Sequence, residues 1–384
     1  MTSTTPRSGP LTDLRVIEIG GIGPGPFAAM MLADLGADVV RIDRTGGIEP
    51  MNTGPHNLLL RGRPSVAMDL KAPAGRDALL QMCESADVLI EGFRPGVMER
   101  LGLGPDDVRA RNSKLVYGRM TGYGQEGPMA SVAGHDINYI SISGVLSTFA
   151  RKGERPLAPL NIVGDFAGGG MLLALGVIAA VLEARSSGEG QVVDTAMVDG
   201  SALLVALFLG LREGGVWTDV PGTNFLDSGA HFYEVYETAD GGFVSVGAIE
   251  SQFYAELLRL LEVDPAEAPQ WDSSRWPELK ERFAEIFRGR TRDEWARILE
   301  PADACAAAIY GMIEAMDHPH MVARGTFIEV DGVRQPGPAP RFSRTPGAVT
   351  SAPAPAGADT ETALEAWGID AQARAALREA GAIA

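Results

Sequence analysis

Three side chains of this sequence belong to types that transfer protons, and each lies beside an apolar segment. His135 follows a Gly- and Pro-rich loop and begins an apolar helical stretch, which predicts an imidazole at a helix N-terminus. Free amides there could hold a developing oxyanion while the imidazole transfers a proton. A lone histidine can also be purely structural, and the pattern alone leaves both interpretations open.

Asp165 precedes a long apolar segment, Phe166–Leu182, in which residues 168–170 are all glycine. The carboxylate could merely cap a helix. Each glycine, however, costs a helix about 1 kcal/mol relative to alanine, and close approach of a ligand to the backbone would explain that cost. Glu250 ends the run 246–250 after a predicted strand, where it could pair with an imidazole or be an exposed charge.

The sequence contains little that would support a metal site, a redox site or a bound dinucleotide. Cys83 and Cys305 belong to no Cys/His cluster, so neither a metal site nor a disulfide framework is expected. The loop GIGPGP at 21–26, with Asp43 about 20 residues on, imitates a dinucleotide-binding fingerprint. Its prolines lack the amide donors that a pyrophosphate needs, and the last proline replaces the third glycine. Tight strand-to-helix packing explains these glycines better, and we expect no cofactor.

The elements that must position these residues follow a βαβ pattern. A β-rich run, Leu14–Ile19, is followed by the helical stretch Phe27–Leu35 and a strand, Ala37–Ile42. A second helix, Gly75–Ser85, runs into a strand with a similar Ala-Asp-Val start, and the strand 114–118 leads into a glycine-rich loop. Repeated units of this kind predict an α/β fold with a doubly wound parallel sheet. Two buried helices are expected at 165–185 and 198–211.

Beyond residue 230 the pattern becomes that of a smaller α+β domain. A hairpin around 238–242 precedes three helices, of which the last begins with Thr291 as N-cap and Glu294 as its capping-box partner. The three helices are predicted at 252–261, 278–287 and 291–300, and a hairpin at 327–333 and helices at 361–367 and 371–380 follow. The predicted organisation is a large domain at 1–213, a linker at 214–229, a small domain at 230–316 and a return segment at 317–384.

Charge and hydropathy narrow the classes of partner. A net charge of -17 repels a phosphate backbone, so no nucleic-acid partner is expected. The first 100 residues are nearly neutral, with 10 Lys/Arg against 12 Asp/Glu, and could tolerate a phosphorylated ligand. The arginines 44, 61, 63, 94 and 100 could bind it, or be ordinary surface groups. No apolar stretch reaches the ~20 residues that cross a bilayer. We therefore expect a cytoplasmic protein with no membrane partner.

Several motifs together resemble the family III CoA-transferase superfamily. They are GPLTDLRVIEI at 9–19, the GIGPGP turn, LGADVVRID at 35–43, DVLIEGFRPG at 87–96, GEGQVVD at 188–194 and DTET at 359–362. The pair GHDINY at 134–139 and GDF at 164–166 resembles the α-methylacyl-CoA racemase branch of that superfamily. The similarity extends over nearly the whole chain.

This resemblance implies a Rossmann-like large domain, a small α+β domain, and two chains interlocked as a homodimer that binds acyl-CoA. His135 and Asp165 match the two proton-transfer residues of the family, and Glu250 matches the acid that orients the histidine. The implied substrate contacts are Arg44, Met68, Asp69, Leu70, Lys71, Gly92, Phe93, Arg94, Arg100, Gly134, Asp136, Ile137, Asn138 and Tyr139. The amide of Asp136 is the expected donor to the enolate oxygen.

The activity implied is interconversion of (R)- and (S)-2-methylacyl-CoA thioesters in lipid metabolism, by removal and return of a proton through an enolate. In transferases of the superfamily, the residue matching Asp165 is a nucleophile, and those members lack a histidine at the position of His135. CoA transfer is therefore the alternative, and a non-catalytic acyl-CoA sensor is a third. The segments 46–57 and 213–222 depart from the shortest family members and could reshape the acyl entrance.

Overall fold

The computed structural model describes residues 6–46 and 56–384, so most of the segment predicted as an insertion at 46–57 lies outside the described residues. The chain divides into two compact units. The first contains residues 1–143, 160–204 and 322–384, and the second contains residues 144–159 and 205–321. Residues 144–159, predicted within the large domain, thus belong to the second unit, where Arg151 donates two 2.8 Å hydrogen bonds to Glu234.

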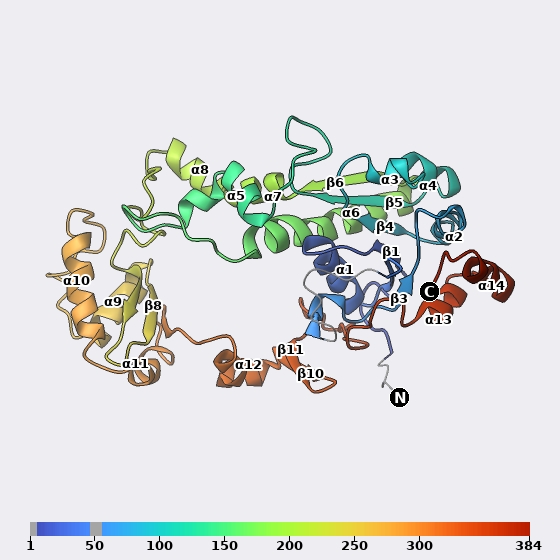
Figure 1. Ribbon diagram of the computed structural model, residues 1–384. Helices are drawn as coiled ribbons and strands as arrows, with labels where there is room; N and C mark the ends of the chain where they lie inside the picture. The colour runs from blue at the N-terminus through green and yellow to red at the C-terminus, as the bar shows by residue number, and fades with distance from the viewer. Residues whose placement is uncertain (1–5, 47–55) are drawn as a thin grey trace. The chain divides into compact units, whose positions relative to one another are not determined.

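The first unit is built on a six-stranded parallel sheet with the strand order β3-β2-β1-β4-β5-β6 (Figure 1). The strands are β1 (Arg15–Ile19), β2 (Asp38–Asp43), β3 (Ser65–Ala67), β4 (Val88–Glu91), β5 (Val116–Thr121) and β6 (Val192–Ala196). The predicted doubly wound parallel sheet is confirmed. Since successive strands leave β1 in opposite directions, the topological switch point lies between β1 and β4, where α/β proteins place their ligands.

Helices cover both faces of this sheet because its strands are apolar on both sides. Along β1, Val16 packs into one core with α1 (Pro24–Asp34) and α6 (Leu172–Ser187), whereas Ile17 packs into the other. Side chains alternate across a strand, so this division is expected of a central strand. The core that contains Ile17 is covered by five helices: α2 (Pro73–Cys83), α3 (Val97–Arg100), α4 (Pro105–Arg111), α13 (Thr360–Ala366) and α14 (Ala371–Glu379).

The C-terminal part of the chain completes this unit. Asp359, immediately before α13, accepts a hydrogen bond of 3.0 Å from the amide of Ser65 on β3. The hairpin of β10 (Phe327–Val330) and β11 (Val333–Pro336) confirms the predicted one, and α12 (Pro319–Arg324) precedes it. Short helical segments η2 (Leu58–Leu60) and α5 (Asp136–Ile142) also belong here.

The helix that carries Asp165 is longer than the sequence predicts. It begins at Ile162 with a wide π-helical part, η4 (Ile162–Met171), and continues without a break as α6 to Ser187. Asp165 therefore lies inside the helix and not in a loop before it. By length and composition alone, this 26-residue helix would be able to cross a membrane. In its most apolar 18-residue window, 44% of the residues are buried inside the protein. The absence of a membrane partner stays a prediction.

The predicted buried helix 198–211 is wrong in continuity and burial. It divides at Val205 into α7 (Met197–Leu204) in the first unit and α8 (Ala206–Glu213) in the second, and α8 buries none of its residues. Apolar side chains such as Leu203 and Leu207 remain more than half exposed. Apolar composition alone thus does not distinguish a core helix from one with an exposed apolar face.

The second unit contains a three-stranded antiparallel sheet with helices packed against it (Figure 1). Its strands are β7 (Tyr233–Glu237), β8 (Phe243–Gly247) and β9 (Ala306–Ala308), and its helical segments are η3 (Val145–Thr148), α9 (Ser251–Leu260), α10 (Trp276–Phe287), α11 (Arg292–Leu299) and η5 (Glu314–Asp317). The predicted hairpin and three helices are confirmed. Thr291 and Glu294 form the predicted capping box, because each accepts a hydrogen bond from the other's amide.

Candidate active site

The predicted site residues of the first unit lie in segments that follow its strands. Arg44 follows β2, residues 68–71 follow β3, residues 92–94 follow β4, and His135 begins α5 after the loop that leaves β5. In a parallel sheet these strand ends share one edge, so the fold gathers segments that are up to 91 residues apart in sequence.

His135 is the N-cap residue of α5 and is exposed. Its backbone amide donates a 3.1 Å hydrogen bond to the side-chain oxygen of Asn138, which fixes the start of the helix. The predicted position at a helix N-terminus is confirmed. Because the first turn of a helix has amides without intrahelical partners, the amide of Asp136, the first residue of α5, is free of such a partner.

The side chain of Asp136 connects the two predicted proton-transfer residues. Its Oδ2 accepts hydrogen bonds from the amides of Gly164 and Asp165, at 2.6 and 2.7 Å. The side chain is 5% exposed, and its Oδ1 is buried without a hydrogen-bond partner among the described residues. Asp136 was predicted as a substrate contact through its amide. The carboxylate has a different role, since it holds the backbone of Asp165 against the start of α5.

The Asp165 carboxyl is half-buried among groups from three segments. Asn161 donates a 2.8 Å hydrogen bond to its Oδ2, and a Cβ atom on Gly23 would lie only 2.9 Å from the same oxygen. The ring of the next residue, Phe166, packs on Phe27 of α1 with the centroids 4.7 Å apart. The loop after β1 therefore forms one wall of the Asp165 environment, and the positive φ of Gly23, +69°, lets the backbone approach this closely.

The electrostatics favour a carboxyl that can hold a proton. Burial raises the pKa of Asp165 above its ordinary value and the negative charge of Asp136 adds to this, whereas the Asn161 hydrogen bond and the charge of His135 lower it. Asp136 links the two residues, because its carboxylate accepts the amide of Asp165 and its backbone directly follows His135. A histidine base and a carboxylic acid, or the reverse pair, are thus available within one site.

The three glycines after Asp165 serve helix packing. A Cβ atom on Gly168 would approach the amide of Ser201 on α7 to 2.7 Å, and one on Gly170 would approach the carbonyl oxygen of Pro24 on α1 to 2.7 Å. The prediction that ligand approach explains these glycines is therefore wrong for Gly168 and Gly170, whose neighbours are protein backbone. Close helix contact offsets the loss of helix propensity.

Tyr139 closes the region beneath His135. Its hydroxyl donates a hydrogen bond to the carbonyl of Gly134, and its ring meets Tyr123 edge-on at 4.8 Å. Cβ atoms on Gly122 or Gly134 would overlap this ring. Burial raises the pKa of Tyr139 to about 12, so its hydroxyl stays protonated at neutral pH. Of the other residues predicted here, Ile137 and Asn138 are exposed.

The predicted phosphate-binding cations are accessible. Arg44, Lys71, Arg94 and Arg100 are exposed, and none of them forms an ion pair within residues 6–46 and 56–384. Beside them, Asp69 accepts a 2.9 Å hydrogen bond from the amide of Lys71, and Met68 is buried. Leu70 and Phe93 are partly buried, and Gly92 is exposed.

Two arginines that the charge pattern singled out belong to the interior. Arg61 is 3% exposed and pairs with Asp34 at 2.5 Å, and Arg63 is fully buried and pairs with Glu18 at 2.7 Å. Asp43, the residue placed like a ribose-binding acid, pairs with Arg41 at 2.7 Å. These groups already neutralise one another and have no charge free for a ligand.

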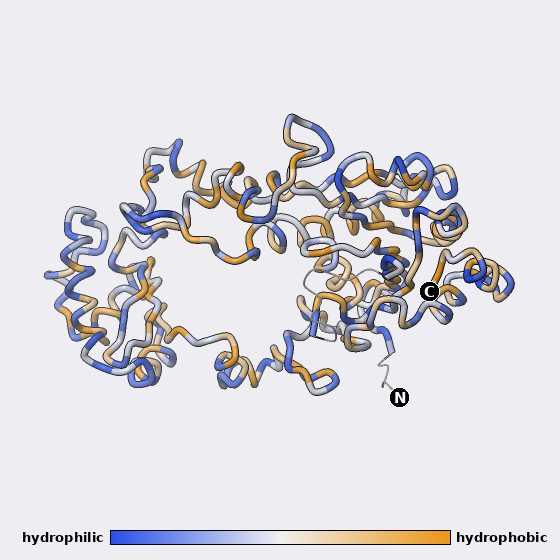
Figure 2. Tube along the Cα trace, in the orientation of Figure 1, coloured by the Kyte–Doolittle hydropathy of each residue, from blue (hydrophilic) through white to orange (hydrophobic). Residues whose placement is uncertain are grey.

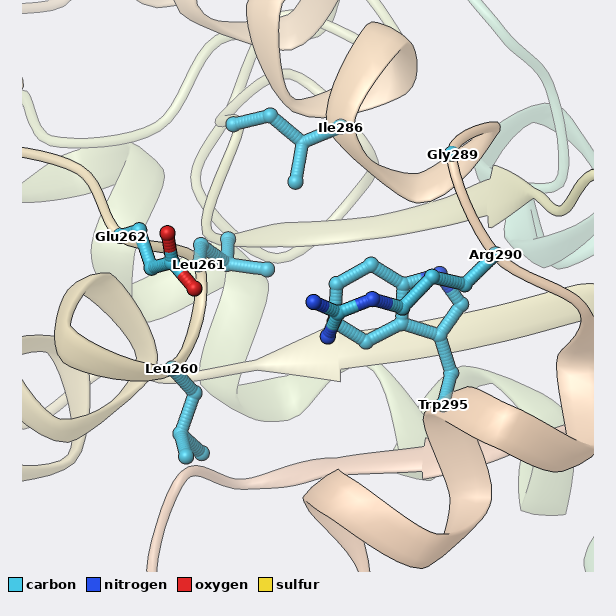
Figure 3. A pocket seen from close by; sticks show the side chains of 7 residues that line it. All are labelled: Leu260, Leu261, Glu262, Ile286, Gly289, Arg290 and Trp295. Carbon is cyan, nitrogen blue, oxygen red and sulfur yellow. The ribbon is translucent and has the colours of Figure 1, made fainter.

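Glu250 lies in the second unit, where it is exposed and precedes α9 as its N-cap residue. A cavity of about 250 Å³ in the same unit is shown in Figure 3, and Arg290 stacks over the ring of Trp295 there at 5.0 Å. Its lining consists of Leu260, Leu261, Glu262, Ile286, Gly289, Arg290 and Trp295. No predicted site residue lines it.

Three contributors to the site were missed from the sequence. Asn161 lies four residues before Asp165, a spacing that places both on one helix face, but the helix was expected to begin later. Gly23 was interpreted only as a packing glycine. Glu91, buried at the end of β4, has no sequence signal beyond its place after an apolar strand.

The fold and the site together define a Rossmann-type α/β protein that carries an imidazole, a carboxyl group and free cationic side chains at the carboxyl edge of its sheet. Residues 11–360 match the model of CoA-transferase family III, and the chain belongs to that family.

Named relatives and solved structures agree with this assignment. The chain is 48% identical to the α-methylacyl-CoA racemase of Mus musculus over 89% of this chain and 88% of the relative, and 44% identical to that of Homo sapiens over 93% of each. The crystal structure of Rv3272 from Mycobacterium tuberculosis is similar with a TM-score of 0.78 and 28% identity, over 92% of this chain and 98% of that one.

Proposed function

We propose that this chain is a racemase that interconverts (R)- and (S)-2-methylacyl-CoA thioesters. The observation that carries the proposal is the connection of His135 to Asp165 through Asp136, whose carboxylate accepts the amide of Asp165 and whose backbone continues from His135. Similarity to the two mammalian racemases supports the same activity.

Inversion at the carbon next to a thioester needs two groups in complementary protonation states. One group removes the α-proton from one face, and the other returns a proton to the opposite face. His135 as base and neutral Asp165 as acid would act in one direction, and their roles reverse in the other. The raised pKa of Asp165 supports this assignment, because the acid must hold its proton near neutral pH.

The enolate between the two proton transfers needs a hydrogen-bond donor. The amide of Asp136 at the start of α5 is suited to this role, because an unpaired helix N-terminal amide combines a donor with the favourable end of the helix dipole. Glu250 is proposed to orient the imidazole of His135. A Glu250→Gln variant that lowers kcat with KM unchanged would support that role.

CoA is proposed to bind through its phosphates to the free cations of the first unit, Arg44, Lys71, Arg94 and Arg100. Arginine suits this role because its planar fork forms paired hydrogen bonds with phosphate. The remaining proposed contacts are Met68, Asp69, Leu70, Gly92, Phe93, Gly134, Ile137, Asn138 and Tyr139, with no separate cofactor or metal required.

The decisive experiment is α-proton exchange. Incubation of (R)- or (S)-2-methyldecanoyl-CoA with the protein in D2O should yield both epimers with deuterium at C2. His135→Ala and Asp165→Asn should each lower this exchange by about 10³-fold, within the range that a positioned acid or base contributes. Retention of configuration and of the proton at C2 with the wild-type protein would exclude the racemase.

CoA transfer remains the second candidate, because a carboxylate such as Asp165 can also act as a nucleophile toward a thioester. The succinyl-CoA–D-citramalate CoA-transferase of Chloroflexus aurantiacus is 29% identical over 88% of this chain. Transfer through an acyl anhydride would let hydroxylamine trap Asp165 as a hydroxamate. A trapped adduct together with CoA appearing on a carboxylate acceptor would favour the transferase.

We further propose a homodimer, in which the chains are interlocked, acting in the cytoplasm in lipid metabolism. Apolar residues recur along the helix 162–187 and the following helices, as the hydropathy colours of Figure 2 show. Several of their large side chains are exposed: Met171 by 51%, Leu175 by 64%, Leu182 by 72%, Leu203 by 63% and Leu207 by 60%. Soluble monomers rarely expose this much apolar surface, so a second copy is the proposed cover.

A further inference from the structure

A buried carboxylate lies directly behind the loop that follows β4. Glu91, the last residue of β4, is 1% exposed. Its Oε2 accepts a 2.7 Å hydrogen bond from the amide of Phe93, and its Oε1 accepts one of 3.0 Å from Nε of Arg119. One side chain therefore holds both the backbone of the loop and a side chain of the neighbouring strand β5.

Arg119 extends this network to α3. The guanidinium is 7% exposed, and its Nη1 and Nη2 donate to the two carboxylate oxygens of Glu99, at 2.8 and 3.3 Å. The segment between Glu91 and Glu99 is thus fastened near its start by the Phe93 amide and at its end by Glu99. Arg94 lies within this segment, and Arg100 follows it.

We propose that Glu91, acting through Arg119 and Glu99, is a positioning residue that fixes Arg94 and Arg100 to receive the phosphates of CoA. This inference rests on the proposed binding of acyl-CoA. Glu91 is buried and is an acid, so it is unsuited to bind a phosphate itself. Its effect is to order the loop on folding, which leaves less conformational freedom to be lost when the ligand binds.

The composition of the network indicates that it positions the loop and does not merely stabilise the fold. Two carboxylates share one guanidinium, and buried ion pairs of this kind add little net stability because desolvation opposes their attraction. Burial raises the pKa of Glu91 to about 7, opposed by the Phe93 amide and by Arg119, while the charge of Glu99 adds to the rise. Tyr117 on β5 also faces it. The charge of Glu91 therefore changes within the pH range of ordinary enzyme assays.

The ionised carboxylate can accept both hydrogen bonds, whereas a proton on either oxygen weakens one of them. CoA affinity should therefore rise as the pH passes upward through about 7. Glu91→Gln is nearly isosteric but always neutral, and its amide nitrogen would confront either the Phe93 amide or Arg119. The variant should behave at every pH like the protonated wild-type protein.

The test is calorimetric titration of the full-length wild-type protein and Glu91→Gln with free CoA, together with steady-state kinetics on 2-methyldecanoyl-CoA. At pH 8 the variant should bind CoA about tenfold more weakly, equivalent to about 1.4 kcal/mol, with KM raised to match and kcat within about twofold. At pH 6, where most of Glu91 is protonated, the difference should shrink to about twofold. Glu84→Gln, which removes an exposed ion pair with Arg111, is the matched control and should change neither constant.

Unchanged CoA affinity in Glu91→Gln at pH 8, or a loss of kcat without a rise in KM, would overturn the inference. If thermal melting shows that this variant does not fold, Glu99→Gln decides, since Glu99 is partly exposed at 44% and its loss frees only the outer end of the network. It should weaken CoA binding about threefold, and an unchanged affinity would then be the contrary result. The proposed racemase activity can fail independently of this inference. A wild-type protein that binds CoA but exchanges no α-proton would refute the racemase and leave the CoA-binding test of Glu91 intact.

Discussion

At the scale of single residues, Asp136 has two effects on the proposed chemistry. Its carboxylate fixes the backbone of Asp165 through hydrogen bonds of 2.6 and 2.7 Å to two successive amides. Its charge also raises the pKa of Asp165, in addition to the larger effect of burial. The two effects can be separated, because an amide in place of the carboxylate keeps an acceptor oxygen but removes the charge.

We expect Asp136→Asn to shift the pH dependence of kcat/KM. Without the neighbouring charge, the pKa of Asp165 falls, so the fraction of protein with protonated Asp165 declines at lower pH. For the substrate epimer that needs this acid, the alkaline limb of kcat/KM should move to lower pH. Rates of deuterium incorporation measured between pH 5 and pH 9 would show this shift of the pH profile.

Two further variants control this prediction. Asp136→Ala loses both hydrogen bonds as well as the charge and should also lower kcat, by about tenfold or more. Asp107→Asn alters another carboxylate that accepts a backbone amide, from Gly104 at 3.1 Å, and should leave the profile unchanged. A profile of Asp136→Asn that coincides with that of the wild-type protein would show that its charge has no influence on Asp165.

His231 gives the second unit a dependence on acid that is unrelated to the site. The ring is fully buried, its Nε2 lies 2.6 Å from the hydroxyl of Tyr254, and its Nδ1 has no partner among the described residues. Burial lowers its pKa from 6.5 to about 4. Between these values the unfolded chain binds the proton and the folded one does not, so the stability that neutral His231 contributes is lost as the pH falls from about 6.5 to about 4.

We expect His231→Phe to reduce this acid sensitivity. The wild-type unit should lose on the order of 3 kcal/mol from this group between pH 7 and pH 4. The variant should lose correspondingly less, because phenylalanine cannot bind a proton. Hydrogen exchange of amides in α9 and α10 at both pH values reports on this unit alone. Equal acid sensitivity of the two proteins would contradict the assignment.

At the scale of elements, the contact between η4 and α7 sets the position of Asp165. A Cβ atom on Gly200 of α7 would lie 1.8 Å from the carbonyl oxygen of Gly168, so these two backbones touch directly. The wide π-helical turns of η4 occur at the same place, and such turns are often found at functional sites. The glycines thus allow a close crossing of the two helices, and the proposed catalytic carboxyl of Asp165 lies at its edge.

Gly200→Ala should separate the two helices and displace Asp165. We expect a loss of about 3 kcal/mol in stability, typical of overpacking, and a fall in kcat larger than the change in KM. Thermal denaturation and exchange kinetics measure the two effects. Gly210→Ala in α8 is the control, since nothing lies within 4 Å of its added Cβ atom, and it should be neutral or slightly stabilising. Similar behaviour of both variants would show that the close crossing is unimportant.

At the scale of the whole molecule, the exposed apolar face of α6 is the feature that a single chain leaves unexplained. Leu175 is 64% exposed and Leu182 72% exposed, on a helix whose opposite face packs in the core with Leu173 and Val177. A helix that is apolar on both sides is expected where two different surfaces cover it. The proposed homodimer supplies the second surface.

The double variant Leu175→Glu/Leu182→Glu should dissociate the proposed dimer, because two charges would be buried in its interface. Light scattering after size-exclusion chromatography should show a mass near twice the chain mass of 40.5 kDa for the wild-type protein and a smaller one for the variant. Gln372→Glu on the exposed face of α14 adds one negative charge away from α6 and should keep the wild-type mass. A monomeric wild-type protein would refute the dimer.

The sequence by itself determined most of the elements and the candidates for the proton-transfer pair. Repeated units of a helix followed by a β-rich run were sufficient for the parallel sheet. A capping box predicted the start of α11, and a Gly- and Pro-rich loop before an apolar stretch predicted the place of His135, because these signals are local. The motifs spread from residue 9 to residue 362 also led to the family that the match over residues 11–360 confirms. The individual site residues stay predictions until they are tested by substitution.

Only the tertiary structure decided which charged groups pair with one another. Arg61 and Arg63 looked as available for phosphate as Arg94, yet they pair with Asp34 and Glu18 in the interior. The link from Asp136 to Asp165 joins residues 29 positions apart, and Glu91 meets Arg119 across 28. Such pairings depend on which strands lie side by side and how closely helices cross. Those are long-range outcomes of packing that no local pattern of residues contains.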